Sequence, residues 1–410
     1  MKEQLRGNAI VGQSGGPTAA INASLAGVIR GCLACAQIET LYGAFHGVEG
    51  MLKDDICDLL ASCHTEEQLE LLSHTPAAAL GSCRKKLPKL GTDDAVYEAL
   101  FSFFRAHNIR YFFYIGGNDS MDTVAKVYAY AKAHDYEICV MGVPKTIDND
   151  VEGTDHTPGY GSAAKYIAAS VAEILRDCAV YTVPAVTIVE IMGRDAGWLT
   201  AAAALPRAVY GVCPDLIYLP ERPFSYEAFF ADVKAALQKH PNVVVAVSEG
   251  IRTQDGTYVG ASTQNGVTDV FGHQYLAGTG KALEHAVKRE IGCKVRSVEL
   301  NILQRCAAHF ASETDLRESV QVGQAAVVAA CAGESGKMMC FVRRTGAYAC
   351  DTVPKAIEEI ANRVRYVPDA FINAAGNQIT DAGVAYLLPL IQGEPALQYE
   401  NGLPKHFILR

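Results

Sequence analysis

The strongest constraint on the fold is an alternation along the chain between short apolar runs and longer segments with helical periodicity. The apolar runs lie at 8–11, 111–115, 138–143, 185–191, 216–219 and 243–247. The segments with one apolar face at helical spacing lie at 19–32, 120–133, 162–177 and 226–239. Strands joined in this order by crossover helices form mostly parallel sheets that helices cover, so the pattern predicts an α/β fold.

The length of the chain indicates two units of this kind. Its 410 residues exceed the roughly 100 to 200 residues of a usual domain. We therefore expect two α/β lobes with a cleft between them. The segment 151–161 contains glycines and a proline and is the expected crossing point between the lobes.

Charge and hydropathy argue against several classes of partner. The net charge is −9, and no Lys/Arg block is long enough to follow a nucleic-acid backbone. No run of eighteen or more apolar residues suggests a membrane span, so we expect no membrane partner and a cytoplasmic location. The thirteen cysteines are scattered through apolar segments, as free core thiols are in a reduced protein. An anionic partner must then be a small molecule that a few focused cations bind.

Two glycine turns each join a predicted strand to a predicted helix, at 11–18 and at 114–122. Adjacent glycines, such as Gly15 and Gly16, let backbone N–H groups approach an anion, and the helix N-terminus adds a partial positive charge. One such turn can equally be an ordinary tight connection. Two of them in one lobe favour a phosphate-binding site.

The second glycine turn continues into Asn118 and Asp119. Their oxygens can hold a hydrated Mg²⁺ beside a phosphate group. The alternative interpretation is structural, because Asp119 or Ser120 can cap the following helix.

A cluster of charge follows the apolar run 138–143, in the segment 144–150. Asp148 and Asp150 are two residues apart and share one face if the segment is extended. Two nearby carboxylates can divide their roles, one near a metal and the other accepting a proton. Lys145 adds a compact cation that suits phosphate oxygens. A solvated loop is the competing interpretation.

Polar residues also follow the later strands. Arg194 can hold a phosphoryl group in a bidentate fork, and Gly193 before it allows a close backbone approach. Glu249 can accept hydrogen bonds from sugar hydroxyls. Arg296 and Arg305 are further cations for a phosphorylated substrate.

These motifs together resemble the phosphofructokinase family, from the first strand to beyond residue 305. The motifs, in the order of the family, are Gly-Gly-x-x-Ser at 116–120, Pro-Lys-Thr-Ile-Asp-Asn-Asp at 144–150, Met-Gly-Arg at 192–194, Ser-Glu-Gly at 248–250 and Gln-Arg at 304–305. The resemblance implies two similar three-layer lobes with the active site between them. It implies a donor-binding lobe of about 1–160 plus 304–385, and a sugar-phosphate-binding lobe of about 161–303 plus 386–410.

The resemblance also implies roles on the sugar side of the site. Asp148 corresponds to the base that takes the proton from the 1-hydroxyl of fructose 6-phosphate, within the substrate-binding run Thr146, Ile147 and Asp148. The other implied sugar-phosphate ligands are Met192, Gly193, Arg194, Glu249, Arg296 and Arg305, with Arg194 also acting in catalysis. Arg296 resembles the arginine that reaches the neighbouring subunit's site, which implies a homodimer or a higher homo-oligomer.

On the donor side, Gly15, Gly16 and Arg84 resemble the residues that bind the phosphoryl donor. ATP-using members carry glycine where this chain has Asp119 and Lys145. A carboxylate at the first position repels an α-phosphate, and an ammonium at the second can neutralise pyrophosphate. The chain thus resembles the diphosphate-dependent 6-phosphofructokinases, whose reaction is reversible and serves glycolysis or gluconeogenesis. An ATP-dependent enzyme and a non-catalytic regulatory subunit of the family are the alternatives.

Three positions depart from the pattern of the family. Asn118 stands where many relatives have a metal-proximal aspartate, so an Mg²⁺ cofactor would depend more on Asp150 and on the donor itself. Asp195 stands where diphosphate-using relatives often have histidine. Ala185 replaces an arginine that crosses the subunit interface in bacterial ATP-using members, which leaves Arg296 for that role.

Overall fold

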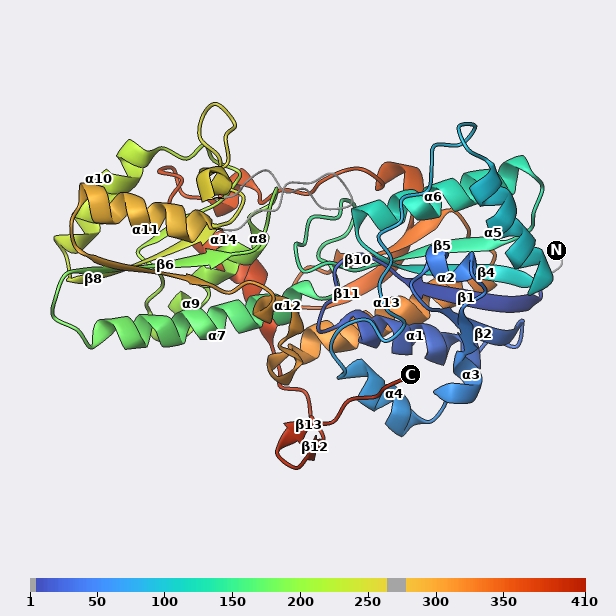
Figure 1. Ribbon diagram of the computed structural model, residues 1–410. Coiled ribbons are helices and arrows are strands. Elements are labelled where there is room, and N and C mark those ends of the chain that lie inside the picture. The colour runs from blue at the N-terminus through green and yellow to red at the C-terminus, as the bar shows by residue number, and fades with distance from the viewer. Residues whose placement is uncertain (1–4, 264–277) are drawn as a thin grey trace.

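The computed structural model describes residues 5–263 and 278–410, and it consists of two α/β lobes side by side (Figure 1). The first lobe contains a seven-stranded sheet in the order β11-β10-β5-β4-β1-β2-β3. Its central strands are parallel, and β3 and β11 pair antiparallel at its two edges. The second lobe contains a parallel sheet in the order β7-β8-β6-β9. The predicted α/β fold with mostly parallel sheets is confirmed.

The bounds of the elements follow the predicted alternation. The strands of the first sheet are β1 (Gly7–Gln13), β2 (Ile38–Ala44), β3 (Ile56–Asp58), β4 (Ile109–Gly116), β5 (Cys139–Pro144), β10 (Lys337–Arg343) and β11 (Cys350–Ala356). Those of the second are β6 (Ala185–Ile191), β7 (Leu216–Tyr218), β8 (Asn242–Ser248) and β9 (Lys294–Glu299), and a small hairpin pairs β12 (Tyr399–Glu400) with β13 (Leu403–Pro404). The helices are α1 (Ile21–Leu33), α2 (Val48–Met51), α3 (Leu59–Ser62), α4 (Glu66–Ser73), α5 (Ala95–Ala106), α6 (Asn118–Ala133), α7 (Tyr160–Ala179), α8 (Trp198–Ala201), α9 (Pro206–Tyr210), α10 (Tyr226–Leu237), α11 (Thr279–Glu290), α12 (Leu303–Cys306), α13 (Glu313–Cys331) and α14 (Asp381–Leu387). Each of the six apolar runs coincides with a strand, and each of the four periodic segments with a helix, to within two residues at either end.

Each sheet buries both of its faces, which makes each lobe three-layered. In the first lobe Val11 and Phe113 pack with α1 and α13 on one face. Ile10 and Phe112, their neighbours in sequence, pack with α5 and α6 on the other. The second sheet is divided in the same way, with α7, α8 and α14 on one face and α10 and α11 on the other. Apolar residues at consecutive strand positions are therefore needed, as in the predicted runs.

The chain crosses between the lobes several times. The first crossing leads through 151–161 into α7, which packs in the core of the second lobe. Residues 367–391, expected mainly in the first lobe, contribute to the same core. The end of the chain, expected in the second lobe, instead packs Phe407 and Leu409 against the first, where the Phe407 N–H donates to Thr75 Oγ1 at 2.8 Å. The division of these two segments between the lobes therefore differs from the expected one.

One pair of cysteines corrects the expectation of free thiols throughout. Cys35 and Cys331 form a disulfide between the C-terminal ends of α1 and α13, and the other eleven cysteines are free. The two helices approach closely because glycines line their contact: a Cβ at Gly27 would lie 2.1 Å from the Val320 carbonyl oxygen. The pairing joins residues 296 positions apart, which no local pattern in the sequence reveals. Among the helices in the described residues, none has both the length and the apolar character that a bilayer crossing requires.

Candidate active site

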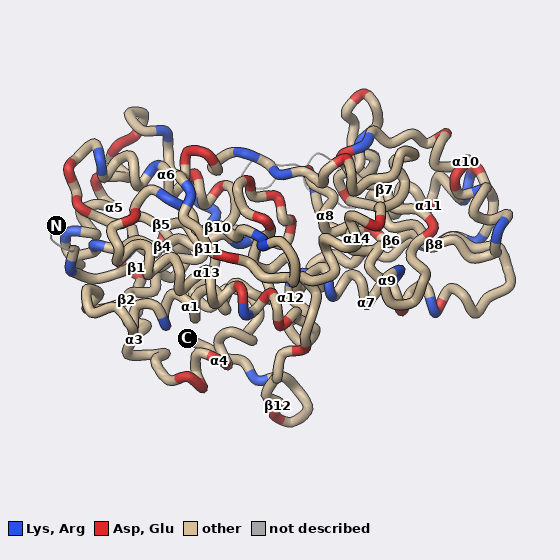
Figure 2. The backbone as a smooth tube through the Cα atoms, turned by 180° about the vertical axis from the view of Figure 1, so that it is seen from behind, with Lys and Arg blue, Asp and Glu red and all other residues tan. Residues whose placement is uncertain are grey.

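A cavity of about 390 Å³ lies where the two lobes face each other, at the carboxyl ends of the central strands. Charged residues of both signs gather along this boundary (Figure 2). The cavity brings together thirteen of the sixteen predicted site residues: Gly15, Gly16, Arg84, Asn118, Asp119, Lys145, Thr146, Asp148, Asp150, Met192, Arg194, Glu249 and Arg305. Open parallel sheets bind ligands at this end of their strands, so the fold itself explains why residues distant in sequence meet here.

The first glycine turn forms one wall of the cavity directly after β1. Gly15 has φ +79°, a left-handed conformation that glycine adopts without strain. A Cβ at Gly15 would lie 3.1 Å from Lys145 Nζ, and one at Gly16 would lie 3.3 Å from an Arg305 guanidinium nitrogen. Two cations from distant parts of the chain thus lie against this backbone, and a Cβ at either glycine would displace the end of a cationic side chain.

The second glycine turn brings Asn118 next to Asp150. Asn118 Nδ2 donates to Asp150 Oδ2 at 3.3 Å and to the Asp150 carbonyl oxygen at 3.4 Å. Asn118 Oδ1 is buried and has no hydrogen-bond partner. The helix-cap alternative is wrong, because Gly117 is the N-cap of α6 and no side chain caps it.

Asp119 forms its ion pair with Lys86, whereas the proposal on donor choice pairs it with Lys145. Its carboxylate forms an ion pair with Lys86 at 3.0 Å, and both side chains are partly exposed. Within the described part of the chain, no ion pair joins Asp119 to Lys145. Asp119 nevertheless lines the cavity, so its charge faces the donor end of the site.

The segment 144–150 is folded into the protein and is not a solvated loop. Only 3% of Lys145 and 9% of Thr146 are exposed. Thr146 Oγ1 donates to Asp148 Oδ2 at 3.2 Å and accepts from the Asp148 N–H at 3.1 Å. Asn149 adopts φ 55° and accepts a hydrogen bond from the Thr157 N–H at 3.0 Å. The segment is thus held in one conformation with Asp148 and Asp150 in the cavity.

Burial changes the charge of the groups in the cavity. It lowers the pKa of Lys145 to about 8, although the nearby Asp148 and Asp150 oppose this shift. Burial, together with the charge of Asp148, raises the pKa of Asp150 to about 7. Burial also raises the pKa of Asp148, and it raises that of Glu249 to about 8. A carboxyl group with a raised pKa is a stronger base once it has lost its proton, which is what proton abstraction requires.

The second lobe supplies the opposite wall of the cavity. After β6, the Met192 N–H donates to Gln304 Oε1 at 3.3 Å, and the Gly193 N–H donates to Glu249 Oε1 at 3.2 Å. A Cβ at Gly250 would lie only 1.8 Å from the Arg194 carbonyl oxygen, so glycine is required after Glu249. The two segments that follow β6 and β8 are therefore held in contact, and Arg194 lines the cavity beside them.

Three predicted residues do not line the cavity. Ile147 is 5% exposed and packs in the core of the second lobe, so it anchors the segment between Thr146 and Asp148. Gly193 acts through its N–H on Glu249. Arg296 lies on β9, the edge strand of the second sheet, and is exposed at the surface of the chain.

The cavity also contains residues that were not predicted. Lys85 lines it beside Arg84, and the run Arg84-Lys85-Lys86 is a cluster of cations that could have been noticed in an acidic chain. Val364 also lines it, from the connection after β11, where no sequence pattern points to a site. Asp195 lines it too and forms an ion pair with Arg252.

The donor atoms around Asn118 suit a divalent cation. The partnerless Asn118 Oδ1 and the neighbouring Asp150 carboxylate are both oxygen ligands, the type that Mg²⁺ prefers. A bound cation would satisfy the buried amide oxygen and would favour the charged form of Asp150. These residues therefore fit the metal that was expected from the sequence.

Comparisons with known proteins agree with this geometry. The family profile described as Phosphofructokinase matches residues 8–330. A Halomonas elongata protein named pyrophosphate–fructose 6-phosphate 1-phosphotransferase is 42% identical, with 97% of this chain and 95% of the relative covered. A Xanthomonas campestris protein of the same name is 43% identical, with 98% and 96% covered. The crystal structure of a pyrophosphate-dependent phosphofructokinase from Nitrosospira multiformis superposes with a TM-score of 0.88 at 36% identity, covering 98% of this chain and 96% of that one. With its strand-end motifs gathered in one inter-lobe cavity, this chain belongs to the phosphofructokinase family.

Proposed function

We propose that this protein is a diphosphate-dependent 6-phosphofructokinase. It transfers a phosphoryl group reversibly from pyrophosphate to the 1-hydroxyl of D-fructose 6-phosphate and yields fructose 1,6-bisphosphate and phosphate. The observation that carries the proposal is Lys145, whose buried Nζ lies inside the cavity and donates to the Gly16 carbonyl oxygen at 2.8 Å. The names of the relatives with about 40% identity support the same activity.

Lys145 discriminates between donors by charge and by volume. Pyrophosphate presents a terminal phosphate to the two glycine turns, and a buried ammonium there neutralises it at short range. An ATP molecule would instead place its α-phosphate and nucleoside where Lys145 and Asp119 stand. Asp119 contributes a negative charge at this end of the cavity, which repels that additional phosphate.

Asp148 is the proposed base for the 1-hydroxyl. Its carboxylate accepts a hydrogen bond from Thr146 Oγ1, which fixes its orientation, and its second oxygen can face the sugar. Arg194 and Lys145 flank the position of the transferred phosphoryl group and offset the charge that develops there. In the reverse direction, Asp148 returns the proton to the sugar oxygen.

Asn118 and Asp150 would hold an Mg²⁺ ion, together with the donor phosphates. The ion supplies charge neutralisation for the phosphoryl oxygens when it is bound. Asp150 contributes the one carboxylate of this pair, and the amide nitrogen of Asn118 orients that carboxylate through its hydrogen bond.

The second lobe is proposed to hold the sugar phosphate. Glu249 is positioned by the Gly193 N–H to accept hydrogen bonds from sugar hydroxyls. Met192 lines the same wall, and Arg305, whose guanidinium lies against Gly16, faces it and can bind the 6-phosphate. Arg296 lies on β9, the edge strand of its sheet, and does not line the cavity of its own chain. We therefore assign it to the active site of a second copy in a homodimer.

The direct test is a donor competition between pyrophosphate and ATP at saturating fructose 6-phosphate and Mg²⁺. We expect the isolated chain to form fructose 1,6-bisphosphate with pyrophosphate and to run the reaction backwards with phosphate. Turnover with ATP alone would support the ATP-dependent alternative. No product with either donor would favour a non-catalytic regulatory subunit.

Lys145→Gly tests the role of the buried Lys145 ammonium in the cavity. Turnover with pyrophosphate should fall by about 100-fold or more, as for the loss of a charge-stabilising donor in other active sites. Lys89→Gly, at an exposed position outside the cavity, is the matched control and should retain full activity. Unchanged pyrophosphate kinetics in Lys145→Gly would remove the basis for the donor assignment. A reversible enzyme of this kind serves glycolysis or gluconeogenesis, and we place it in the cytoplasm.

A further inference from the structure

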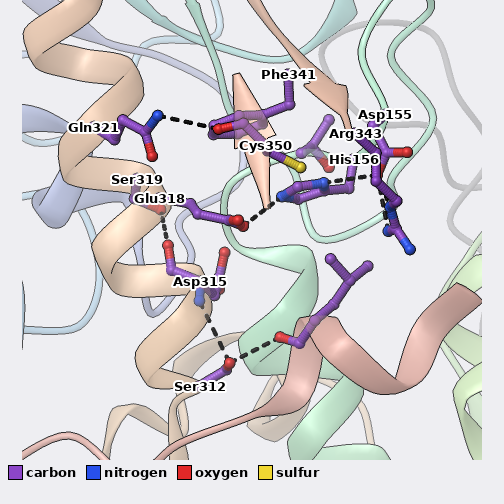
Figure 3. Close-up of polar contacts among 12 residues, drawn as sticks. Asp155, His156, Ser312, Asp315, Glu318, Ser319, Gln321, Phe341, Arg343 and Cys350 are labelled. Atoms are coloured by element: carbon purple, nitrogen blue, oxygen red, sulfur yellow. Dashed lines mark hydrogen bonds and ion pairs between the residues drawn. The ribbon is translucent and has the colours of Figure 1, made fainter. Parts of the chain in front are cut away.

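A buried histidine lies in the first crossing between the lobes, outside the cavity. His156 is 2% exposed, and its ring stacks on Phe341 with centroids 4.6 Å apart (Figure 3). Its Nδ1 lies 3.0 Å from Asp155 Oδ1, and its Nε2 lies 2.8 Å from Glu318 Oε2 on α13. Carboxylates accept hydrogen bonds and a neutral imidazole can donate only one, so the ring that satisfies both contacts carries two protons.

The surroundings of His156 balance its charge. Arg343 on β10 donates to Asp155 at 2.9 Å, and the Tyr348 hydroxyl donates to Glu318 at 2.9 Å. Two cations therefore face two carboxylates. Besides Asp155, the titratable and charged groups around the ring, from every element packed against it, are Asp315, Glu318, Arg343, Tyr348, Cys350 and Tyr386.

A metal ion is the alternative occupant of this cluster. One ligand atom each from Asp155, His156 and Cys350 lies within 4.8 Å of the others. However, Arg343 donates twice to the same Asp155 oxygen that faces His156 Nδ1, at 2.9 and 3.2 Å. A metal would have to displace this guanidinium group and the ring proton together, so the contacts favour an imidazolium.

The loop that carries His156 is hydrogen-bonded to the segment 144–150. Thr157, the next residue, donates from Oγ1 to the Thr146 carbonyl oxygen at 2.7 Å. Its N–H donates to Asn149 Oδ1 at 3.0 Å. The Thr146 N–H in turn donates to the Pro158 carbonyl oxygen at 3.1 Å. Two of these hydrogen bonds fix the loop to Thr146, whose hydroxyl orients Asp148, and the third fixes it to Asn149.

We propose that His156, protonated at both ring nitrogens, is a positioning residue for phosphoryl transfer: it joins Asp155 to Glu318 and thereby fixes Thr157, which holds Thr146 beside Asp148. The inference rests on the proposed function, because it gives Asp148 the role of base. It extends the machinery of the site to α13 and β10, which do not line the cavity. It also explains why the buried ion pairs of His156 with Asp155 and Glu318 lie in the segment that connects the lobes.

The sign of the pH effect follows from the contacts. Burial alone lowers the pKa of His156, but hydrogen bonds to Asp155, Cys350 and Glu318 outweigh this and raise the pKa well above its ordinary value. The stabilisation is therefore complete below about pH 6.5, the ordinary histidine value, and is lost only as the pH rises through the higher pKa of the folded state. At neutral pH the ring remains charged.

His156→Gln tests the proposal, because glutamine cannot donate to both carboxylates in this geometry. We expect kcat to fall about tenfold or more through misplacement of the base, while the KM values for both substrates change by less than about threefold. We also expect the acidic limb of kcat/KM to move to higher pH, since the Thr146 hydrogen bond lowers the pKa of Asp148. His240→Gln is the control: His240 makes a similar contact with Asp215 at 2.8 Å, remote from this loop, and its loss should leave the profile unchanged.

Thr157→Val tests the same connection if His156→Gln does not fold, because it leaves His156 and its two carboxylate partners unchanged. It removes the hydroxyl donor to Thr146 at nearly constant shape, and the same shift of the acidic limb is expected. Side-chain ¹⁵N chemical shifts of the wild type, assigned by difference from Thr157→Val and His156→Gln samples, should show two protonated nitrogens at pH 7. A neutral or metal-bound ring, an unmoved acidic limb, or a fall in kcat that matches only the unfolded fraction would overturn the inference. Failure of the wild type to form fructose 1,6-bisphosphate would instead identify the proposed function as the error.

Discussion

Burial shifts the pKa values of Lys145 and Asp150 toward neutral pH before ligands bind. Burial moves the pKa of Lys145 down to about 8 and that of Asp150 up to about 7, so each group is partly uncharged near neutral pH. An anionic donor favours the ammonium form of Lys145, and a divalent cation favours the carboxylate form of Asp150. The site therefore reaches its full charge only when both ligands are present, which couples binding of the metal to binding of the donor.

This coupling predicts a pH dependence for metal binding. Mg²⁺ binds the deprotonated carboxylate, so its affinity should be constant well above pH 7 and should weaken by about tenfold per pH unit below the pKa of Asp150. Isothermal titration of the protein with Mg²⁺ between pH 5.5 and 8.5 measures this. Asp150→Asn should abolish the dependence together with most of the affinity. A pH-independent affinity in the wild type would show that Asp150 is not a ligand.

Asp148 should be needed for turnover and not for binding of the sugar. Asp148→Ala removes the proposed base, and kcat should fall by about 10² to 10⁴, the usual contribution of general base catalysis. The Kd for fructose 6-phosphate should remain within about threefold, because Glu249 and Arg305 still line the cavity. Asp93→Ala, in an exposed loop, is the control for removal of a carboxylate. Normal turnover in Asp148→Ala would refute the assignment.

At the scale of elements, the first glycine turn can take part in donor binding because Lys145 and Arg305, from other parts of the chain, lie against it. Gly15 and Gly91 have nearly the same positive φ, +79° and +80°. A Cβ at Gly15 would contact Lys145 Nζ at 3.1 Å, whereas a Cβ at Gly91 would have nothing within 4 Å. The two positions therefore separate backbone strain from obstruction of the site.

We predict that alanine at either position costs about 1 kcal/mol of unfolding free energy through the left-handed backbone. Only Gly15→Ala should raise the KM for pyrophosphate, by about tenfold, because it displaces the ammonium from the cavity wall. Urea denaturation and steady-state kinetics of the two variants measure both effects. Equal kinetics in Gly15→Ala and Gly91→Ala would contradict the close approach.

The elements that could be predicted from the sequence are those with a continuous apolar run or one apolar face. Six strands are buried on both faces and contain runs of mostly apolar residues: β1, β4, β5, β6, β7 and β8. β11 could not be found in this way, because each of its residues is only partly buried and none forms an apolar run. It pairs with β10 at the edge of the sheet, where one side of a strand has no neighbour.

The site residues that could be predicted from the sequence are those that lie near the ends of predicted strands. Asp148, Arg194 and Glu249 lie within four residues of strand ends, so their convergence follows from the two parallel sheets. Lys85 and Val364 reach the cavity from irregular connections, which carry no periodic signal. The ion pair of Asp119 with Lys86 likewise depends on the path of a loop. The sequence therefore predicted the proposed catalytic residues better than the cavity residues that irregular connections supply.

At the scale of the whole molecule, the repeated crossings of the chain tie the two walls of the cavity together. The Arg365 N–H, in the last third of the chain, donates to the Asp150 carbonyl oxygen at 2.8 Å. The same arginine lies 4.2 Å from the centroid of Trp198 in the second lobe, and Trp198 Nε1 donates to its carbonyl oxygen at 3.0 Å. A single residue thus contacts the segment 144–150 and the core of the opposite lobe.

Arg296 leads to a prediction about the assembly. It lies on an edge strand outside the cavity of its own chain, so in the proposed homodimer it serves the sugar-phosphate site of the partner. Arg296→Ala should raise the KM for fructose 6-phosphate at least tenfold and leave the KM for pyrophosphate unchanged, because the donor end is built from one chain. Sedimentation should show that the variant remains dimeric.

Mixing two impaired variants at low fructose 6-phosphate distinguishes a shared site from a site within one chain. In a two-fold dimer of Arg296→Ala with Asp148→Ala, one of the two sites combines an intact Asp148 with the intact Arg296 of its partner. After equal amounts of the two proteins are unfolded and refolded together, about a quarter of all sites should be complete, and activity at low fructose 6-phosphate should rise to about that fraction of the wild type. If Arg296 acts within its own chain, the mixed dimer contains no complete site, and the mixture stays at the average of the two variants.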